Sequence, residues 1–296
     1  MPNTLAHIGL QTPLTKLGFT TAPLQWIALG CIIPDIPWIL QRILRLIPAI
    51  DPVDLRLYAL FQASLFSCCV LSLAFALLTR KTGFIFLILS LNSLFHLLLD
   101  ACQIKWGNGI NLLLPFSWHT TNFGLFWPEH TITYILIAMG SIALIVLWPS
   151  AVKSELFLQK PNTKKCIVLG FSLIFYTTGP FLFTEAAYNA DVHYSKTIRH
   201  KWEQTGKTVE IDRGNYTQQT QSIDSYAAKA LPLNNPLAVQ SGIVSIRGIF
   251  DQKHRITVTE YHEHNSHRDY ASYAGLFLVL LLWTHSIIRM RTQARE

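Results

Sequence analysis

The chain has 296 residues, of which 50% are hydrophobic and 14% are charged, and its mean hydropathy is +0.30. A soluble domain of this length cannot bury that much apolar surface in one core, so the composition argues against a soluble fold and predicts an integral membrane protein. The net charge of +7 does not indicate nucleic-acid binding, because the basic residues flank apolar runs, where such residues set membrane topology.

The N-terminal segment predicts a short helical hairpin. Residues 4–19 and 23–34 are apolar runs, each shorter than a standard membrane span, and a turn-forming stretch separates them. The first residues contain neither a basic n-region nor a small-residue cleavage site, so we expect the first helix to be retained. Residues 38–48 place apolar and basic side chains at helical spacing, which predicts a helix lying in the membrane interface.

Longer apolar runs predict membrane-spanning helices. They cover residues 57–79, 83–101, 131–150, 166–187 and 272–289. Cysteines lie in or beside the apolar segments without CxxC spacing, so we interpret them as packing residues. Together with the hairpin, these runs predict an α-helical integral membrane protein with about six to seven membrane helices.

Residues 188–271 change abruptly to a polar, turn-rich composition and predict a small, mainly β insert outside the membrane. Its strand-like stretches are residues 207–211, 242–250 and 254–264, and the last two predict a β-hairpin. Residues 190–204 are expected to be helical and to extend the preceding span. The predicted domains are therefore a membrane helical domain, the β domain, and a final membrane helix with a basic tail, at residues 1–187, 188–271 and 272–296.

Lysine and arginine cluster in the short connections between the predicted helices. The clusters contain Arg80, Lys81, Lys153, Lys160, Lys164, Lys165, Arg289, Arg291 and Arg295. The positive-inside rule predicts that all of them, and the C terminus, are cytoplasmic, which places the loop 102–130 and the β insert outside. Arg42, Arg45 and Arg56 then also lie outside, against the rule.

Ionisable residues inside the apolar runs predict a functional site. His96 and Asp100 are four residues apart, so one helix face carries both. The hairpin brings His7 and Asp35 to the same membrane depth, and two imidazoles with two carboxylates match the ligands of a zinc or manganese site. The alternative is structural: a polar pair at a helix end, a terminal histidine without a role, and a turn-forming aspartate before Pro37.

A second group of histidines lies in the β insert and just before it. It contains His193, His200, His254, His262, His264 and His267. His262 and His264 alternate, so both can project from one face of a strand. Metal binding and a solvated polar face are the two interpretations, and the absence of cysteines or of fixed ligand spacing favours the solvated face.

Four short motifs occur in order: MPNTLAHIGL with His7, IIPDIPW with Asp35, SLFHLLLDA with His96 and Asp100, and LLLPFSW at residues 112–118. In these motifs, residues 1–120 resemble a family of bacterial inner-membrane metal-dependent hydrolases, some of which are described as LexA-binding. The chain departs from the family pattern at Pro37, where a second aspartate is usual. It also departs at residues 58–64, where YALFQAS keeps only the serine of a His-Arg-Gly-x-Thr-His-Ser motif.

The resemblance implies a hydrolase of the bacterial inner membrane, or a catalytically reduced relative, with a divalent metal at His7, Asp35, His96 and Asp100. Asp35 or Asp100 would be the catalytic carboxylate, and lipid-linked or phosphate-ester substrates would suit a site at the outer face. Three consequences of the missing histidines stay open: the site binds metal weakly, it uses Gln62, His119 or His130 instead, or it has lost hydrolysis. The alternative function is a non-enzymatic membrane protein whose outer β domain binds an envelope partner. A transporter is less expected, because the sequence has no inverted repeat.

Overall fold

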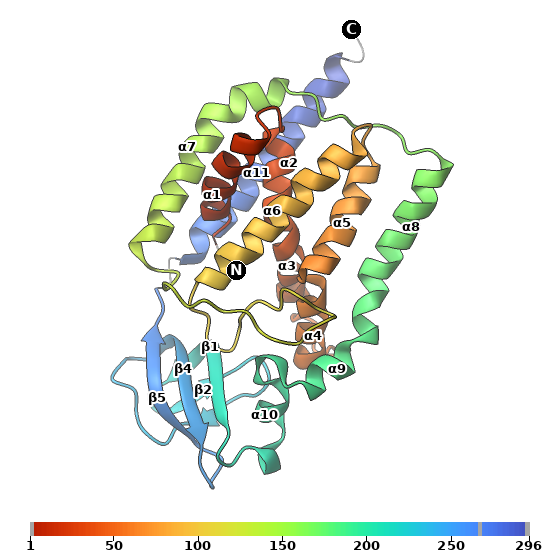
Figure 1. The fold of residues 1–296 in the computed structure, drawn as a ribbon. Helices are drawn as coiled ribbons and strands as arrows, with labels where there is room; N and C mark the ends of the chain where they lie inside the picture. The colour runs from red at the N-terminus through yellow and green to blue at the C-terminus, as the bar shows by residue number, and fades with distance from the viewer. Residues whose placement is uncertain (1–2, 266–267, 294–296) are drawn as a thin grey trace.

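The computed structural model describes residues 3–265 and 268–293, and it combines a helical bundle with an antiparallel β sheet packed at one end of that bundle (Figure 1). The chain starts inside the bundle, in the half nearer the sheet, with α1 (Thr4–Gly18), turns at the far end of the bundle, and returns in α2 (Leu24–Ile32). These two helices form the predicted hairpin. Asn3 caps α1 by accepting a hydrogen bond from the Leu5 amide at 3.1 Å.

The returning helix does not end at residue 34. A 3-10 turn, η1 (Ile33–Asp35), connects α2 to α3 (Ile36–Leu44), and residues Leu24–Leu44 together are long and apolar enough for one span. Pro34 and Pro37 fall in the first turns of η1 and α3, where a missing N–H does not break a helix. The segment predicted to lie in the interface, residues 38–48, is therefore helical as far as Leu44, and its helix continues from α2 through η1.

The predicted span at residues 57–79 is two helices. α4 (Pro52–Gln62) and α5 (Leu65–Leu77) meet at an angle of 66°. The Ser64 hydroxyl accepts a hydrogen bond from the Ser67 amide at 3.3 Å and so starts a new helix, which is why the apolar run does not form one rod.

The other long helices follow the predicted runs closely. They are α6 (Thr82–Cys102), α7 (Thr131–Lys153), α8 (Thr163–Thr178), which continues into η2 (Gly179–Leu182), and α11 (Arg268–Gln293). Among the described residues, five helices are long and apolar enough to cross a membrane, or six if the bent pair α4–α5 is one span. Large apolar side chains such as Ile145, Phe171 and Leu280 are 64–74% exposed, a pattern compatible with a multi-pass membrane protein.

The β sheet is five-stranded and antiparallel, with the order β3-β2-β1-β4-β5. Its strands are β1 (Thr208–Thr217), β2 (Ser222–Asp224), β3 (Leu231–Pro232), β4 (Gly242–Phe250) and β5 (Ile256–Glu263). The predicted hairpin of the last two strands is confirmed. The short strands β2 and β3 carry too few alternating residues to be visible in the sequence.

Residues 190–204 do not extend the preceding helix. After α9 (Thr184–Asn189) they form three single turns: η3 (Val192–Tyr194), α10 (Ser195–Arg199) and η4 (Lys201–Glu203). Asp191, His193 and Tyr194 have φ values of 52°, 56° and 59°, and this left-handed backbone interrupts a regular helix. The chain is thereby turned toward the sheet.

The basic connections lie at the end of the bundle away from the sheet (Figure 1). The turn between α5 and α6 touches the segment between α7 and α8, because the Arg80 amide donates to Phe157 O at 2.8 Å. It also touches the start of α8, where Lys165 Nζ donates to Thr79 O at 2.7 Å. The described end of α11 reaches the same side, whereas Arg295 lies outside the described residues.

Candidate metal centre

The four polar residues singled out in the sequence lie together at the sheet end of the helical bundle. His7 comes from α1, Asp35 from η1, and His96 and Asp100 from successive turns of α6. Each of the four is at most 6% exposed. The convergence follows from the hairpin, which returns Asp35 to the depth at which His7 starts, and from the packing of α2 against α6.

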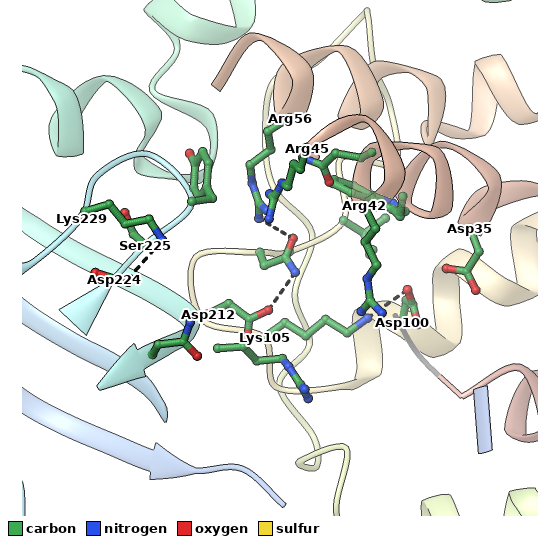
Figure 2. Close-up of a pocket in the computed structure, with 18 residues that line it drawn as sticks. Asp35, Arg42, Arg45, Arg56, Asp100, Lys105, Asp212, Asp224, Ser225 and Lys229 are labelled. Carbon is green, nitrogen blue, oxygen red and sulfur yellow. Dashed lines mark hydrogen bonds and ion pairs between the residues drawn. The ribbon is translucent and has the colours of Figure 1, made fainter. Parts of the chain in front are cut away.

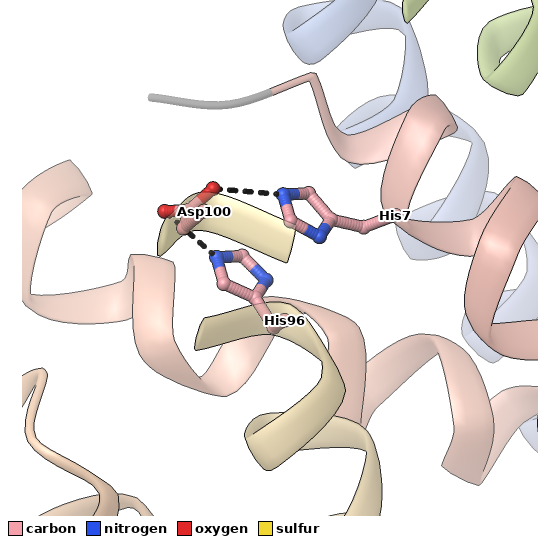
Figure 3. A group of neighbouring side chains, drawn as sticks. All are labelled: His7, His96 and Asp100. Carbon is pink, nitrogen blue, oxygen red and sulfur yellow. Dashed lines mark ion pairs between the residues drawn. The ribbon is translucent and has the colours of Figure 1, made fainter. Parts of the chain in front are cut away.

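The Asp100 carboxylate lies between two imidazoles (Figure 3). His7 Nε2 is 3.4 Å from Asp100 Oδ1, and His96 Nε2 is 3.7 Å from Asp100 Oδ2. The two rings stack in parallel, with centroids 3.7 Å apart. Asp35 joins from the side, with its Oδ1 at 3.7 Å from His96 Nε2.

Hydrogen bonds behind the rings define which imidazole nitrogen carries the proton. His96 Nδ1 lies 2.6 Å from Cys31 O, and a carbonyl oxygen only accepts, so His96 donates through Nδ1. The Gln11 amide suits its neighbours when its oxygen accepts from His7 Nδ1 at 3.3 Å and its nitrogen donates to Asn92 O at 2.9 Å. Both Nε2 atoms then direct a lone pair toward the carboxylates. Histidines that bind metals are held in this way.

A buried lysine joins the cluster. Lys105 Nζ lies 2.9 Å from Asp100 Oδ2, and Lys105 is only 7% exposed. When both carboxylates are ionised and both imidazoles are neutral, the one ammonium leaves a negative charge in the buried cluster, and a bound cation would balance it. Among the described residues, His7 Nε2, Asp35 Oδ2 and Asp100 Oδ1 are buried without a hydrogen-bond partner.

The donor atoms fit a divalent metal. Ligand atoms of His7, His96 and Asp100 all lie within 4.8 Å of one another. Ligands at about 2.0–2.1 Å from a tetrahedral zinc ion are about 3.3–3.4 Å apart, close to the 3.4 and 3.7 Å between the imidazole nitrogens and the Asp100 oxygens. Two imidazoles and a carboxylate are also a ligand set that such metals accept.

The residues considered as replacements for the missing family histidines do not reach this cluster. Gln62 Nε2 donates to Tyr176 O at 3.0 Å and so bonds to α8. His119 is exposed on the loop 103–130, and His130 caps α7, where its Nδ1 accepts from the Ile132 amide at 3.4 Å. The residue that does enter is Lys105, which sequence reasoning missed. Its one signal was a basic residue just past the helix that carries Asp100.

A cavity of about 330 Å³ adjoins the cluster, between the bundle and the sheet (Figure 2). Asp35 and Asp100 lie at one side of it, and Asp224 and Lys229 at the other. Its lining contains six basic side chains, which are Arg42, Arg45, Arg56, Lys105, Arg213 and Lys229. Against them stand four carboxylates, those of Asp35, Asp100, Asp212 and Asp224. Asp269 also pairs with Arg42 at 3.9 Å and with Arg213 at 3.5 Å. The remaining surplus of positive charge favours an anionic ligand.

The predicted solvated face of insert histidines is wrong for two of them. The His264 side chain is 1% exposed, and His193 is 5% exposed. Both face the loop 103–130, whose position on the sheet no sequence pattern indicates. His264 pairs with Glu129, and His193 Nε2 lies 3.0 Å from Gly109 O. Burial and Arg56 lower the pKa of His193 to about 3. His267 lies outside the described residues.

Comparison with models of known protein families, with curated proteins and with solved structures finds no match to this chain. The resemblance to membrane-bound hydrolases therefore rests on the short motifs alone, and the geometry of the cluster carries the functional argument.

Proposed function

We propose that the chain is a multi-pass protein of the bacterial inner membrane and a metal-dependent hydrolase. Its zinc or manganese ion would be held by His7, His96 and Asp100. The observation that carries the proposal is the position of the Asp100 carboxylate between the Nε2 atoms of two imidazoles. A hydrogen bond at Nδ1 orients each imidazole ring. A water-exposed polar pair would need neither the burial nor the orienting bonds.

The four residues take different roles in this proposal. A divalent metal bound at the cluster would lower the pKa of a water molecule and polarise the bond to be cleaved. Asp100 is the ligand, because it contacts both imidazoles and Lys105. Asp35 is the proton acceptor, because its Oδ2 has no hydrogen-bond partner among the described residues and it lines the cavity.

The cavity supports an anionic substrate, such as a lipid-linked or phosphate ester. Arg42 of α3 and Arg45, the residue after α3, line the cavity between the bundle and the sheet, where a headgroup would bind. A guanidinium group can donate two parallel hydrogen bonds to two oxygens of one phosphate. The cavity lies at the sheet end of the bundle and the basic connections lie at the opposite end, so the site would face the outer side of the membrane.

Metal content and turnover of the detergent-purified protein test the proposal. The wild type should retain about one equivalent of zinc or manganese at this site and hydrolyse an aryl phosphate ester. D100N and H96A should lose that metal and the activity together, while D35N should keep the metal and lose activity. H119A changes an exposed loop histidine and should keep both.

A folded wild type that binds no metal here and hydrolyses none of these esters would overturn the proposal. The second candidate, a non-enzymatic protein whose outer β domain binds an envelope partner, would then take its place. One observation favours it: Lys105 already supplies a positive charge to Asp100, so the ammonium would serve in place of a metal as a structural ion pair.

A further inference from the structure

A second cluster of metal-ligating side chains lies outside the proposed active site. Glu129, just before α7, meets His262 and His264 at the end of β5. Ligand atoms of the three residues lie within 4.8 Å of one another. The cluster joins two segments about 135 residues apart, at the place where the sheet abuts the bundle.

The carboxylate of Glu129 faces both imidazoles. Glu129 Oε1 is 2.9 Å from His264 Nδ1, and Glu129 Oε2 is 3.5 Å from His262 Nε2. The His264 amide donates to Ile243 O at 2.9 Å, so the strand pairing continues past β5 and keeps both histidines on one face. Trp127 stacks on the His262 ring at 3.7 Å and fixes its plane.

The hydrogen bonds behind His264 show what its Nδ1 can offer. Ser245 Oγ accepts from the Arg213 amide at 3.0 Å and donates to Asp212 Oδ1 at 3.1 Å. The hydroxyl has only one proton, so at the 2.7 Å contact with His264 Nε2 it is the imidazole that donates. Nδ1 then presents a lone pair to a carboxylate oxygen 2.9 Å away. Either a second proton or a metal ion has to lie between them.

We propose that Glu129, His262 and His264 bind a divalent transition metal, with zinc as the best match to two imidazoles and one carboxylate. Ser245 orients His264, and Trp127 orients His262, as outer-shell groups do in zinc sites. The metal links the sheet to the start of α7 and so fixes the sheet over the cavity. This site is independent of the one formed by His7, His96 and Asp100.

Zinc titration of the full-length protein in detergent tests the second site, with D100N removing the first. The wild type should bind two equivalents of zinc and D100N one. D100N/H262A and D100N/E129Q should bind none, while D100N/H119A, which changes an exposed histidine of the same outer region, should still bind one. Zinc should raise the melting temperature of D100N but not of D100N/E129Q. Gel filtration of each variant establishes that it is folded.

Retention of one equivalent by both D100N/H262A and D100N/E129Q would overturn this inference, as would a folded D100N that binds no zinc. The two proposals fail separately. If the wild type binds one equivalent that H262A removes and D100N does not, the second site stands and the proposed active site loses its metal. If the wild type binds one equivalent that D100N removes and H262A does not, the second site holds a His264–Glu129 ion pair and no metal.

Discussion

Lys105 is the residue whose chemistry most affects the cluster. Its ammonium is buried and pairs with Asp100 at 2.9 Å. Removing one partner of a buried pair leaves an uncompensated charge, so K105M should lower the free energy of unfolding of the metal-free protein by about 3 kcal/mol. Zinc should restore more stability to K105M than it adds to the wild type, because the metal then supplies the missing positive charge. Denaturation in detergent with and without zinc measures both effects.

The matched control is K160M, which removes an exposed lysine at the other end of the molecule. Its unfolding free energy should change by less than about 0.5 kcal/mol. Equal losses for K105M and K160M would contradict the buried pair.

His193 predicts a dependence of stability on pH. Arg56 Nε donates to its Nδ1 at 3.3 Å, and its Nε2 donates to Gly109 O, so the folded state holds the neutral ring. The folded pKa is about 3, below the ordinary 6.5, so the unfolded chain binds the proton first. The contribution of His193 to the free energy of unfolding is therefore complete above pH 6.5 and is lost as the pH falls toward 3.

Between pH 6.5 and 5 the loss attributable to His193 should reach about 2 kcal/mol, at about 1.4 kcal/mol per pH unit. Comparing the denaturation of the wild type and of H193Q across this pH range separates the contribution of His193 from those of other titrating groups. H193Q should show a flatter profile below pH 6.5. Parallel profiles would mean that His193 does not contribute.

At the level of elements, the approach of α1 to α7 positions His7. A Cβ on Gly140 would lie 1.9 Å from Leu5 O, and a Cβ on Gly9 would lie 2.0 Å from Leu136 O. The two backbones touch, as small residues allow in membrane helices. G140A should therefore push α1 outward, lower the unfolding free energy by about 1–3 kcal/mol and weaken metal binding through His7.

G170A is the control for this effect, because a Cβ there meets nothing within 4 Å. G170A should leave metal affinity unchanged, because the added methyl group displaces no neighbour. It should not lower stability either, since alanine suits a helix better than glycine does. Denaturation and metal titration of the two variants test the comparison. Unaltered metal affinity in G140A would show that α1 tolerates the shift.

For the whole molecule, the arrangement predicts one orientation. The basic connections occupy the end opposite the sheet, so a reporter fused after Glu296 should be cytoplasmic and one inserted near Gln219 should be outside. Arg42, Arg45 and Arg56, which break the positive-inside rule, line the cavity and so have a reason to lie at the outer end. A pair of reporters active on opposite sides of the membrane measures the topology. Inverted labelling would refute it.

The sequence by itself determined the features that depend on local periodicity. The long helices α6 and α7 and the β4–β5 hairpin fall where apolar runs and alternation predicted them. His96 and Asp100 share a helix face because helical spacing alone fixes that relation. The bend at Ser64 was not predicted, because a single capping hydrogen bond decides it within a continuous apolar run.

Only the tertiary structure decided which distant residues meet. His7 of α1 meets Asp100 of α6, and Glu129 reaches His262 and His264 because the loop 103–130 lies on the sheet. These contacts join segments that no repeat or spacing relates. Backbone hydrogen bonds specify a helix or strand from neighbouring residues, whereas the packing of one element on another depends on the shape and charge of both, and no single segment of the sequence contains that information.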